Sequence, residues 1–412
     1  MTRLDPRQVN NPKLAYAQDS RDAAMPEVKH DGNVGVAVIC SLHQARTFST
    51  EWAKFAGEAG GDNPFVHPDW MLPWAERFLR RNETIRLLVA RQDGRLVGVA
   101  PFYRRSWGPG LAHSMQLWGT GRHSDLTEMP GLLVDQSQSR NVTRALIRTL
   151  CTLSGTWDWA CVPLQYPLWF EPDWLPRGGS IAALAGTVRA SVVRSVGNPH
   201  PLPVKRNVRE SLRRARNRLD RDFAGRWRVD RATVQADVLN AMADLQGLHA
   251  ARSLMSGKEV HPNVLRDDAD ASYLRTVLAV AADRGGVCIY RLFVDSRAIA
   301  ALLVLRTPVT TYLLLSGMSE EAWDYSAVTL LQGLAMDDAE QLGHRYVNLS
   351  TGPNTPKLRW SQEILVHPEF LLVPDRPLSL ARFGAYYLVA AAAALKRERR
   401  RHKVLTQNFS DQ

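Results

Sequence analysis

An arginine-rich stretch between residues 205 and 230 is the strongest candidate for binding an anion. It holds ten basic and four acidic residues, in a chain of 412 residues with a net charge of +11. Arginine side chains form paired hydrogen bonds with phosphate and carboxylate groups, so the stretch suits a phosphate-bearing ligand. A solvated helix face is the alternative interpretation. The arginines in question are Arg206, Arg209, Arg213, Arg214, Arg216, Arg218 and Arg221.

The rest of the excess charge lies near the C-terminus. Residues 396–403 hold six basic side chains against Glu398, and they follow the apolar run Phe383–Leu395. That run is shorter than the roughly 20 residues of a membrane-spanning helix. An apolar helix with a basic end can bind an anionic membrane surface, or it can dock on the protein body. Because the charge is confined to two stretches, we expect no DNA-binding surface.

Two carboxylates occupy the polar loop Thr120–Glu128, which follows an apolar segment. Asp125 and Glu128 are candidates for a general base, because a positioned carboxylate can take the proton of a nucleophile. Capping and turn formation are the alternative role for the same side chains.

Other kinds of site have little support in the sequence. The 11 histidines and four cysteines show no metal-ligand spacing, so we expect no metal site. Scattered cysteines are typical of core thiols in a reducing cytoplasm, where we expect the protein to reside. Walker, nucleophile-elbow and kinase motifs are missing. The polar N-terminus has no secretory signal, and residues 1–33 are predicted to be a disordered leader.

The elements that would position these residues occur twice in the same order. A predicted hairpin at Asp93-Gly94 precedes a third strand, a helix over 140–153 and a strand over 157–164. A hairpin at Asp295-Ser296 starts the same series about 200 residues later, with its helix over 326–342. The sequence therefore predicts an α/β (α+β) fold of two tandem modules, each a mixed, mostly antiparallel sheet flanked by helices.

The predicted organisation has four parts. They are the leader, an N-terminal module over 34–178, a C-terminal module over 179–376, and a C-terminal helix with a basic tail over 377–412. Within the arginine-rich stretch, apolar residues at helical spacing predict an amphipathic helix. Its apolar seam consists of Val208, Leu212, Ala215 and Leu219.

Five segments in this order resemble a known family. They are NPFVHPDWMLPW, LVARQDGRLVGVAPFYRR, WGTGRHSDLTE, VRESLRRARNRLDRD and LSTGPNTPKLRW. Together they resemble the cellulose-biosynthesis-type (CelD-like) acetyltransferases of the GNAT superfamily, in a tandem form similar to the Fem-type peptidoglycan aminoacyl transferases. The resemblance covers roughly residues 36–370.

This resemblance implies an acyl-CoA-dependent N- or O-acyltransferase with a small polar acceptor of an anionic or sugar type. Acyl-CoA would be the co-substrate, with no metal. Two alternatives remain: an aminoacyl-tRNA-dependent transferase with the basic helix on tRNA, and a non-catalytic GNAT-like assembly subunit.

In the GNAT superfamily the coenzyme pyrophosphate binds a glycine loop that leads directly into a helix. Gln116, Gly119 and Gly121 match the letters of that loop, but a strand follows them, so a glycine turn is the expected structure. The equivalent stretch of the second module has acidic residues and ends at Ser326, which is expected either to cap the next helix or to contact the donor.

Further roles follow from the resemblance. His249 matches a histidine that is frequent in the family, and a buried structural histidine is the alternative. Tyr325 is a candidate general acid toward the thiolate. Lys357, Arg359 and Trp360 lie in a stretch that borders the donor or acceptor channel in the Fem-like relatives, so we expect an anion contact there.

Overall fold

A computed structural model describes residues 25–410, apart from 31–32, 60–61, 109, 166–167, 169, 177–179, 198–203 and 256–260. Most of the predicted leader and the predicted boundary at 178/179 therefore lie outside the described residues. The predicted domain boundaries stay predictions.

The first module follows the predicted order of elements. At the tip of its hairpin Asp93 and Gly94 have φ of 50° and 78°, the left-handed backbone that a tight turn between antiparallel strands requires. The elements are β1 (Met25–His30), β2 (Val34–Ile39), α1 (Leu42–Glu58), α2 (Pro68–Phe78), β3 (Thr84–Gln92), β4 (Arg95–Trp107), β5 (Ala112–Leu117), β6 (Leu133–Val134), α3 (Ser139–Thr152) and β7 (Trp159–Pro163).

The second module repeats this order after a long strand and an arginine-rich helix. The elements are β8 (Ile181–Ser195), α4 (Arg206–Asp222), β9 (Trp227–Ala232), α5 (Gln235–Ser253), α6 (Asp268–Asp283), β10 (Val287–Val294), β11 (Arg297–Arg306), β12 (Thr310–Met318), α7 (Ala327–Gln341), β13 (Tyr346–Thr351), α8 (Thr355–Leu358), β14 (Glu363–Pro374) and α9 (Pro377–Ser410).

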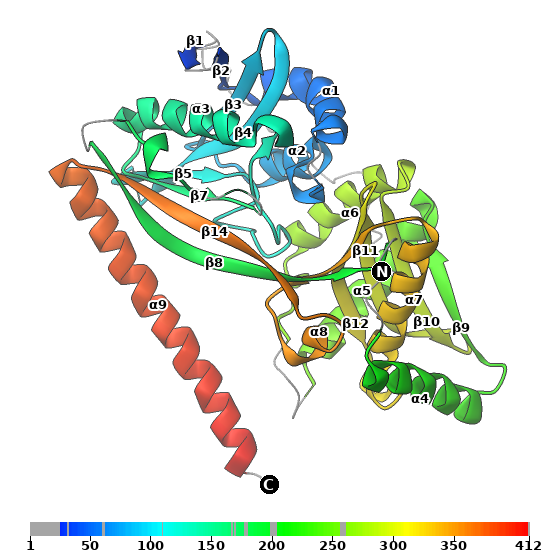
Figure 1. The fold of residues 1–412 in the computed structure, drawn as a ribbon. Coiled ribbons are helices and arrows are strands. Elements are labelled where there is room, and N and C mark those ends of the chain that lie inside the picture. Colours follow the sequence, from blue (N-terminus) through cyan, green and yellow to red (C-terminus); the bar gives the residue numbers. More distant parts are fainter. Residues whose placement is uncertain are drawn as a thin grey trace, which may run out of the picture.

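The strands of both modules form one continuous sheet. Its order is β1-β2-β3-β4-β5-β7-β14-β8-β13-β12-β11-β10-β9, with β6 beside β4. The pairs β5–β7 and β12–β13 are parallel, and the other pairs are antiparallel. β14 is the last strand of the second module in sequence but pairs with β7 of the first module and with β8, and β8 pairs with β13 (Figure 1). The predicted α/β fold with mostly antiparallel sheets is confirmed, and these two strands join its halves.

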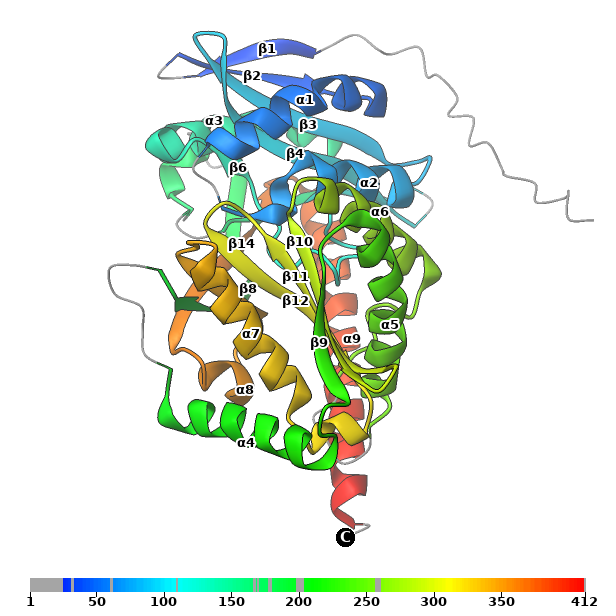
Figure 2. The same cartoon turned by 90° about the vertical axis from the view of Figure 1, so that its right-hand side faces the viewer.

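Helices cover both faces of the sheet. In the second module α5 and α7 lie on opposite faces of β9–β12 (Figure 2). The apolar faces of α1, α2, α5 and α6 form one cluster that is shared by the two modules. The other face is covered by α3 in the first module and by α4 and α7 in the second, in two separate clusters.

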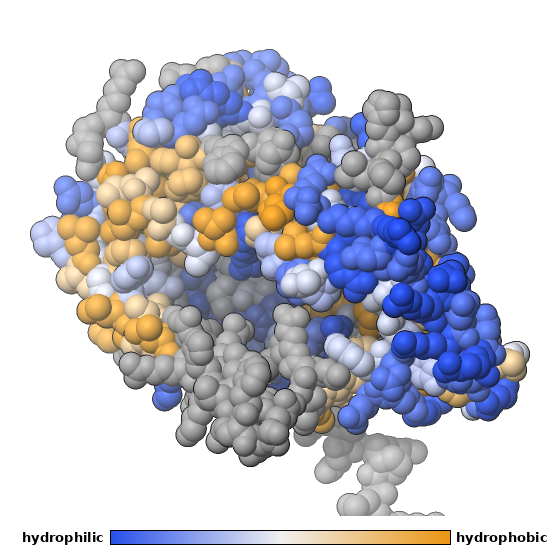
Figure 3. Space-filling model, turned by 60° about the horizontal axis from the view of Figure 1, so that its bottom comes forward, coloured by the Kyte–Doolittle hydropathy of each residue, from blue (hydrophilic) through white to orange (hydrophobic). Residues whose placement is uncertain are grey.

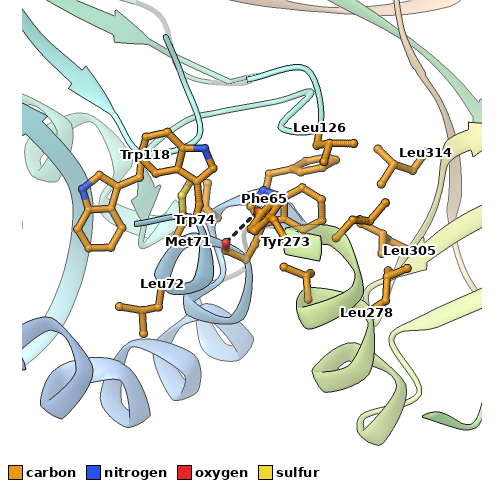
Figure 4. Close-up of a cluster of buried hydrophobic side chains, with 14 of the residues drawn as sticks. Phe65, Met71, Leu72, Trp74, Trp118, Leu126, Tyr273, Leu278, Leu305 and Leu314 are labelled. Atoms are coloured by element: carbon orange, nitrogen blue, oxygen red, sulfur yellow. Dashed lines mark hydrogen bonds between the residues drawn. The ribbon is translucent and has the colours of Figure 1, made fainter. Parts of the chain in front are cut away.

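Aromatic side chains dominate the shared cluster where α2 meets α6. The ring centroids of Trp70 lie 4.9 Å from Phe65 and 5.6 Å from Tyr273, both edge to face. The buried Tyr273 hydroxyl donates to the carbonyl of Trp70 at 3.0 Å (Figure 4). Each aromatic pair contributes about 0.5–1.5 kcal/mol beyond its burial. The two modules are therefore packed as a single body.

The predicted C-terminal helix and basic tail form one helix, α9. Its first turns pack on the first module, where Phe383 and Tyr386 contact Trp107 and Trp159. Beyond them α9 leaves the body (Figure 1). Among the described residues, no helix is both long and apolar enough to cross a membrane.

All four cysteines carry free thiols, as expected. Cys151, Cys161 and Cys288 are buried and Cys40 is half-buried.

Candidate functional site

The strands β12 and β13 separate partway along their length. They pair from Thr310–Tyr346 to Tyr312–Asn348 and then diverge, although both strands continue. Each carries a register irregularity at this point: β12 has an extra residue at Leu314 relative to β11, and Ser350 of β13 has a left-handed φ of 76°. Bulges of this kind are common beside active sites, because they redirect side chains.

Glu128 reaches this separation from the first module. Its carboxylate accepts a hydrogen bond from the Ser350 hydroxyl. The Arg189 guanidinium donates to the carbonyls of Thr127 and Glu128, both at 3.2 Å, and so fixes the loop. The first module therefore contributes a carboxylate to the place where the strands of the second module separate.

Burial raises the pKa of the Glu128 carboxyl to about 7, although hydrogen bonding by Ser350 and the charge of Lys357 oppose the rise. The residue as a whole is only half-buried, but its carboxyl group is enclosed. A carboxyl with a pKa near neutrality is suited to general base catalysis at neutral pH.

Lys357 lies close enough to this carboxylate for its charge to lower the Glu128 pKa, and its expected contact with a ligand anion stays a prediction. Its ammonium donates to the carbonyl of Thr351, and its backbone N–H is capped by the Asn354 side chain at 3.2 Å. Arg359 instead points to α4, where it donates to the Ser211 hydroxyl at 3.1 Å. Of the two basic residues Lys357 and Arg359, Lys357 is therefore the one near Glu128.

His249 is buried on α5 against β12, with both ring nitrogens occupied. Its Nδ1 lies 2.8 Å from the carbonyl of Ser316, and its Nε2 accepts from the N–H of Val264 at 3.3 Å. Burial lowers its pKa. These contacts define a neutral ring that donates through Nδ1, which suits a residue that positions β12 better than one that carries protons.

A second histidine and an arginine complete this side of the site, and the sequence analysis missed both. The ring of His261 lies 5.0 Å from that of His249, and burial lowers its pKa to about 4. Arg252 donates to the Ser316 hydroxyl at 2.5 Å. The charge of Lys357 also acts on His261, so this group and the Glu128 group adjoin each other. No recognised motif pairs two histidines at the spacing of His249 and His261, so the sequence did not indicate this contact.

A cavity of about 310 Å³ is lined by residues of both modules, among them Met129, the residue after Glu128. Met129 lines it and contacts the Asn348 amide (3.6 Å from Nδ2 to Sδ), while Asn348 also accepts from the N–H of Ser350 at 2.9 Å. Among the described lining residues none is lysine or arginine. The polar lining consists of Asp62, Asn63, Gln136, Gln165, Thr310, Tyr312, Tyr346, Asn348, Glu363 and His367.

The arginine-rich helix α4 packs on α7 by its predicted apolar seam. Val208, Ala215 and Leu219 are buried, and Leu212 lies over Gly333 of α7. Arg206, Arg209 and Arg213 point into solvent, and Arg206 pairs with Glu210 at 3.0 Å. The arginines that we expected to bind an anion are thus available on the surface.

The C-terminal end of α4 meets the start of α7. Arg218 donates to the carbonyl of Asp324 at 2.5 Å, and the Tyr325 hydroxyl donates to Asp222 at 3.3 Å. Burial and the carboxylate of Asp222 raise the pKa of Tyr325. Ser326 occupies the predicted N-cap position, but with a left-handed φ of 49° and no capping bond from its side chain. Tyr325 and Ser326 therefore lie with α4, and none of these bonds reaches Glu128.

Trp360 is a core residue. It is 4% exposed, and its indole N–H donates to the Gln332 side chain at 3.2 Å. Its position leaves little surface for a ligand contact.

Asp125 is exposed and lies near Asp270 of α6, away from the Glu128 carboxylate. There His123 pairs with Asp270 at 2.9 Å, and Asp267 is close enough for the three ligand atoms to lie within 4.8 Å of one another. Asp267 also caps α6, so this group holds the loop against the helix. Of the two candidate bases, only Glu128 reaches the separated strands.

The glycine motif of the first module forms a packed turn. A Cβ on Gly121 would meet the Gln116 side chain at 2.2 Å, and one on Gly119 would meet the Thr127 hydroxyl at 2.7 Å. Both glycines also have positive φ. The positive φ and the close packing are enough to explain why glycine occupies both positions, and coenzyme binding is not needed to explain the motif.

The first module's own parallel pair is covered. β5 and β7 pair only at Ser114–Trp159 and Met115–Ala160. The rings of Trp107, Trp159 and Tyr386 pack together there, with Trp159 and Tyr386 stacked at 4.7 Å. These rings cover the place where β5 and β7 pair, so among the described strands a ligand could enter between strands only in the second module, where β12 and β13 diverge.

Comparison with known proteins also points to the second module, where β12 and β13 separate. Residues 206–358 match a family model described as an acetyltransferase (GNAT) domain. No curated protein matches the chain.

Solved structures resemble the whole chain at low sequence identity. FemX is 10% identical with a TM-score of 0.55, over 81% of this chain and 98% of its own. A structure described as the C-terminal domain of a lysylphosphatidylglycerol synthetase from Agrobacterium fabrum is 12% identical over 84% and 98%, with a TM-score of 0.49. A tandem GNAT protein from the clavulanic acid biosynthesis pathway is 13% identical over 83% and 99%, with a TM-score of 0.41. The last two scores add nothing to the fold assignment.

The separated parallel strands and the helix that follows β12 agree with the family match. Residues 206–358 are thus similar to an acetyltransferase (GNAT) domain, within a chain whose fold is two tandem GNAT-like modules.

Proposed function

We propose that the protein is an acyltransferase whose second module holds an acyl-CoA donor and whose first module supplies Glu128 as the general base. The observation that carries the proposal is the enclosed Glu128 carboxyl, with its pKa near 7, at the separation of β12 and β13.

The reaction would proceed by direct transfer. An acceptor amine or hydroxyl attacks the thioester carbonyl, and Glu128 takes the proton that the nucleophile loses. The carbon–sulfur bond then breaks and the coenzyme leaves as a thiolate, which is protonated on release. The Ser350 hydroxyl holds the carboxylate in place, and the charge of Lys357 favours its ionised form.

The cavity that Met129 and Asn348 line suits a neutral or cationic acceptor. Its amides, hydroxyls and the carboxyls of Asp62 and Glu363 match the hydroxyl and amino groups of a sugar-type molecule, and its described lining contains no cationic side chain. An anionic acceptor would find no cationic partner among these described residues, and the carboxylates would repel it. Of the two expected acceptor types we therefore retain the sugar type.

The donor phosphates would lie on the side of α4 and the start of α7. Backbone N–H groups at a helix start favour anions, and the exposed Arg209 and Arg213 place further positive charge along α4. Thiol release from acetyl-CoA in the presence of a panel of amino sugars and amines tests the proposal. No release with any of them would count against it.

Alanine at both Arg209 and Arg213 is expected to raise the KM for acetyl-CoA by about 2–30-fold, because exposed phosphate contacts contribute about 0.5–2 kcal/mol. kcat and the unfolding temperature should stay unchanged, since both side chains are exposed. The Arg77→Ala/Arg81→Ala variant, which removes two exposed arginines of the first module, is the matched control. An equal KM in the two variants would remove α4 from donor binding.

A thermal shift experiment separates the donor from its alternatives. Coenzyme A at 100 times its dissociation constant should stabilise the protein by about 2.7 kcal/mol, because it binds the native state alone. Stabilisation by aminoacyl-tRNA and not by coenzyme A would favour the Fem-type alternative, which the arginines of α4 and the fold likeness to FemX support. No shift with either would favour the non-catalytic subunit. Membership of the CelD-like family stays part of this proposal.

A further inference from the structure

Beyond Phe383, helix α9 exposes apolar side chains in several directions. Phe383 is 9% exposed, but Tyr387, Leu388 and Val389 are 59%, 71% and 70% exposed, and Leu395 is 58% exposed. Successive residues of a helix are about 100° apart, so the three neighbours point in three directions. A helix that is apolar all round is normally covered by other apolar groups.

A basic block follows within the same helix. Residues 396–403 carry six basic side chains against Glu398, and α9 extends to Ser410. Hydrophobic side chains gather on the left of the view in Figure 3, the side on which α9 begins in Figure 1, and hydrophilic ones gather on the right. The apolar segment and the positive charge are thus adjoining parts of one projecting element.

We propose that α9 beyond Phe383 docks on an anionic phospholipid surface. The apolar segment would enter the boundary of the acyl chains, and the basic block would bind the lipid headgroups. A second copy of the chain could cover the apolar side chains but would leave the basic blocks without opposite charge. An anionic bilayer satisfies both features, and this proposal stands independently of the catalytic one.

The test is co-sedimentation of the full chain with vesicles of phosphatidylcholine alone and of phosphatidylcholine with phosphatidylglycerol. We expect binding to the anionic vesicles, weakened by added salt because headgroup attraction is screened. The Leu388→Glu/Val389→Glu variant should bind at least about tenfold more weakly, since it removes two exposed apolar groups. Leu342→Glu, at an exposed leucine of the second module, should bind as the unmodified protein does.

Three outcomes would overturn the proposal. They are no binding to anionic vesicles, equal binding to neutral ones, and a Leu388→Glu/Val389→Glu variant that binds as well as Leu342→Glu. Sedimentation velocity completes the test: a dimer that the double variant abolishes, without vesicle binding, would identify a second copy as the occupant. Thermal melting of both variants checks that their folds are intact.

Discussion

Replacement of Glu128 by glutamine is expected to lower kcat/KM for acyl transfer by about 10²–10⁴-fold, the usual contribution of a general base. The amide keeps the size of the side chain and its bond from Ser350 but cannot take a proton. The readout is thiol release from acetyl-CoA with an amino sugar acceptor. Asp125→Asn, an exposed carboxylate of the same loop, should leave the rate unchanged. Full activity of the glutamine variant would remove Glu128 from the mechanism.

The same substitution is expected to stabilise the protein above neutral pH. The Glu128 pKa is about 7 in the folded chain against an ordinary value of 4.5, because charging the enclosed carboxyl is unfavourable. As the pH rises from 4.5 to 7, the unfolded chain loses this proton first, so the stability of the unmodified protein falls by up to about 3 kcal/mol. Urea unfolding at pH 8 should show Glu128→Gln as the more stable protein, and at pH 4.5 the difference should vanish.

The second large effect is expected at Gly317 of β12, which faces the backbone of α5. A Cβ there would lie 2.4 Å from the His249 nitrogen and 2.5 Å from the Leu248 carbonyl carbon, neither of which is a flexible side chain. Gly317→Ala should therefore destabilise the protein by about 1–3 kcal/mol. By moving α5 it should also weaken the bond from His249 to Ser316.

Gly247 provides the control on the same helix. It is exposed, and nothing lies within 4 Å of its Cβ position, so Gly247→Ala should stabilise the protein by about 0.5–1 kcal/mol through helix propensity. Thermal unfolding of the two variants measures the contrast. Equal unfolding temperatures would show that α5 and β12 are not in the close contact described.

The features predicted correctly from sequence are those with local causes. The Asp93-Gly94 turn follows from the backbone preference of its residues, and the seam of α4 follows from helical spacing. The tandem order of elements was visible because each hairpin and each helix has its own pattern of apolar residues. Local patterns therefore gave the module type and the buried face of α4.

What the sequence did not reveal depends on contacts between distant residues. β14 pairs with β7 across about 200 residues, and nothing in either strand specifies that partner. The bond between Glu128 and Ser350 spans 222 residues. The sequence offered no reason to prefer Glu128 over Asp125 as the base. The packing of the second module against their loop encloses the Glu128 carboxyl and leaves Asp125 exposed. The same dependence on packing explains why His261 was missed.

The pH dependence of kcat/KM tests the central claim most directly. With an acceptor that supports thiol release from acetyl-CoA, the rate of the unmodified protein should rise with pH and level off above an apparent pKa near 7, as Glu128 loses its proton. In Glu128→Gln the residual rate should lack this rise. A rate that is independent of pH through neutrality, or an unchanged rise in the glutamine variant, would contradict the assignment of Glu128 as the base.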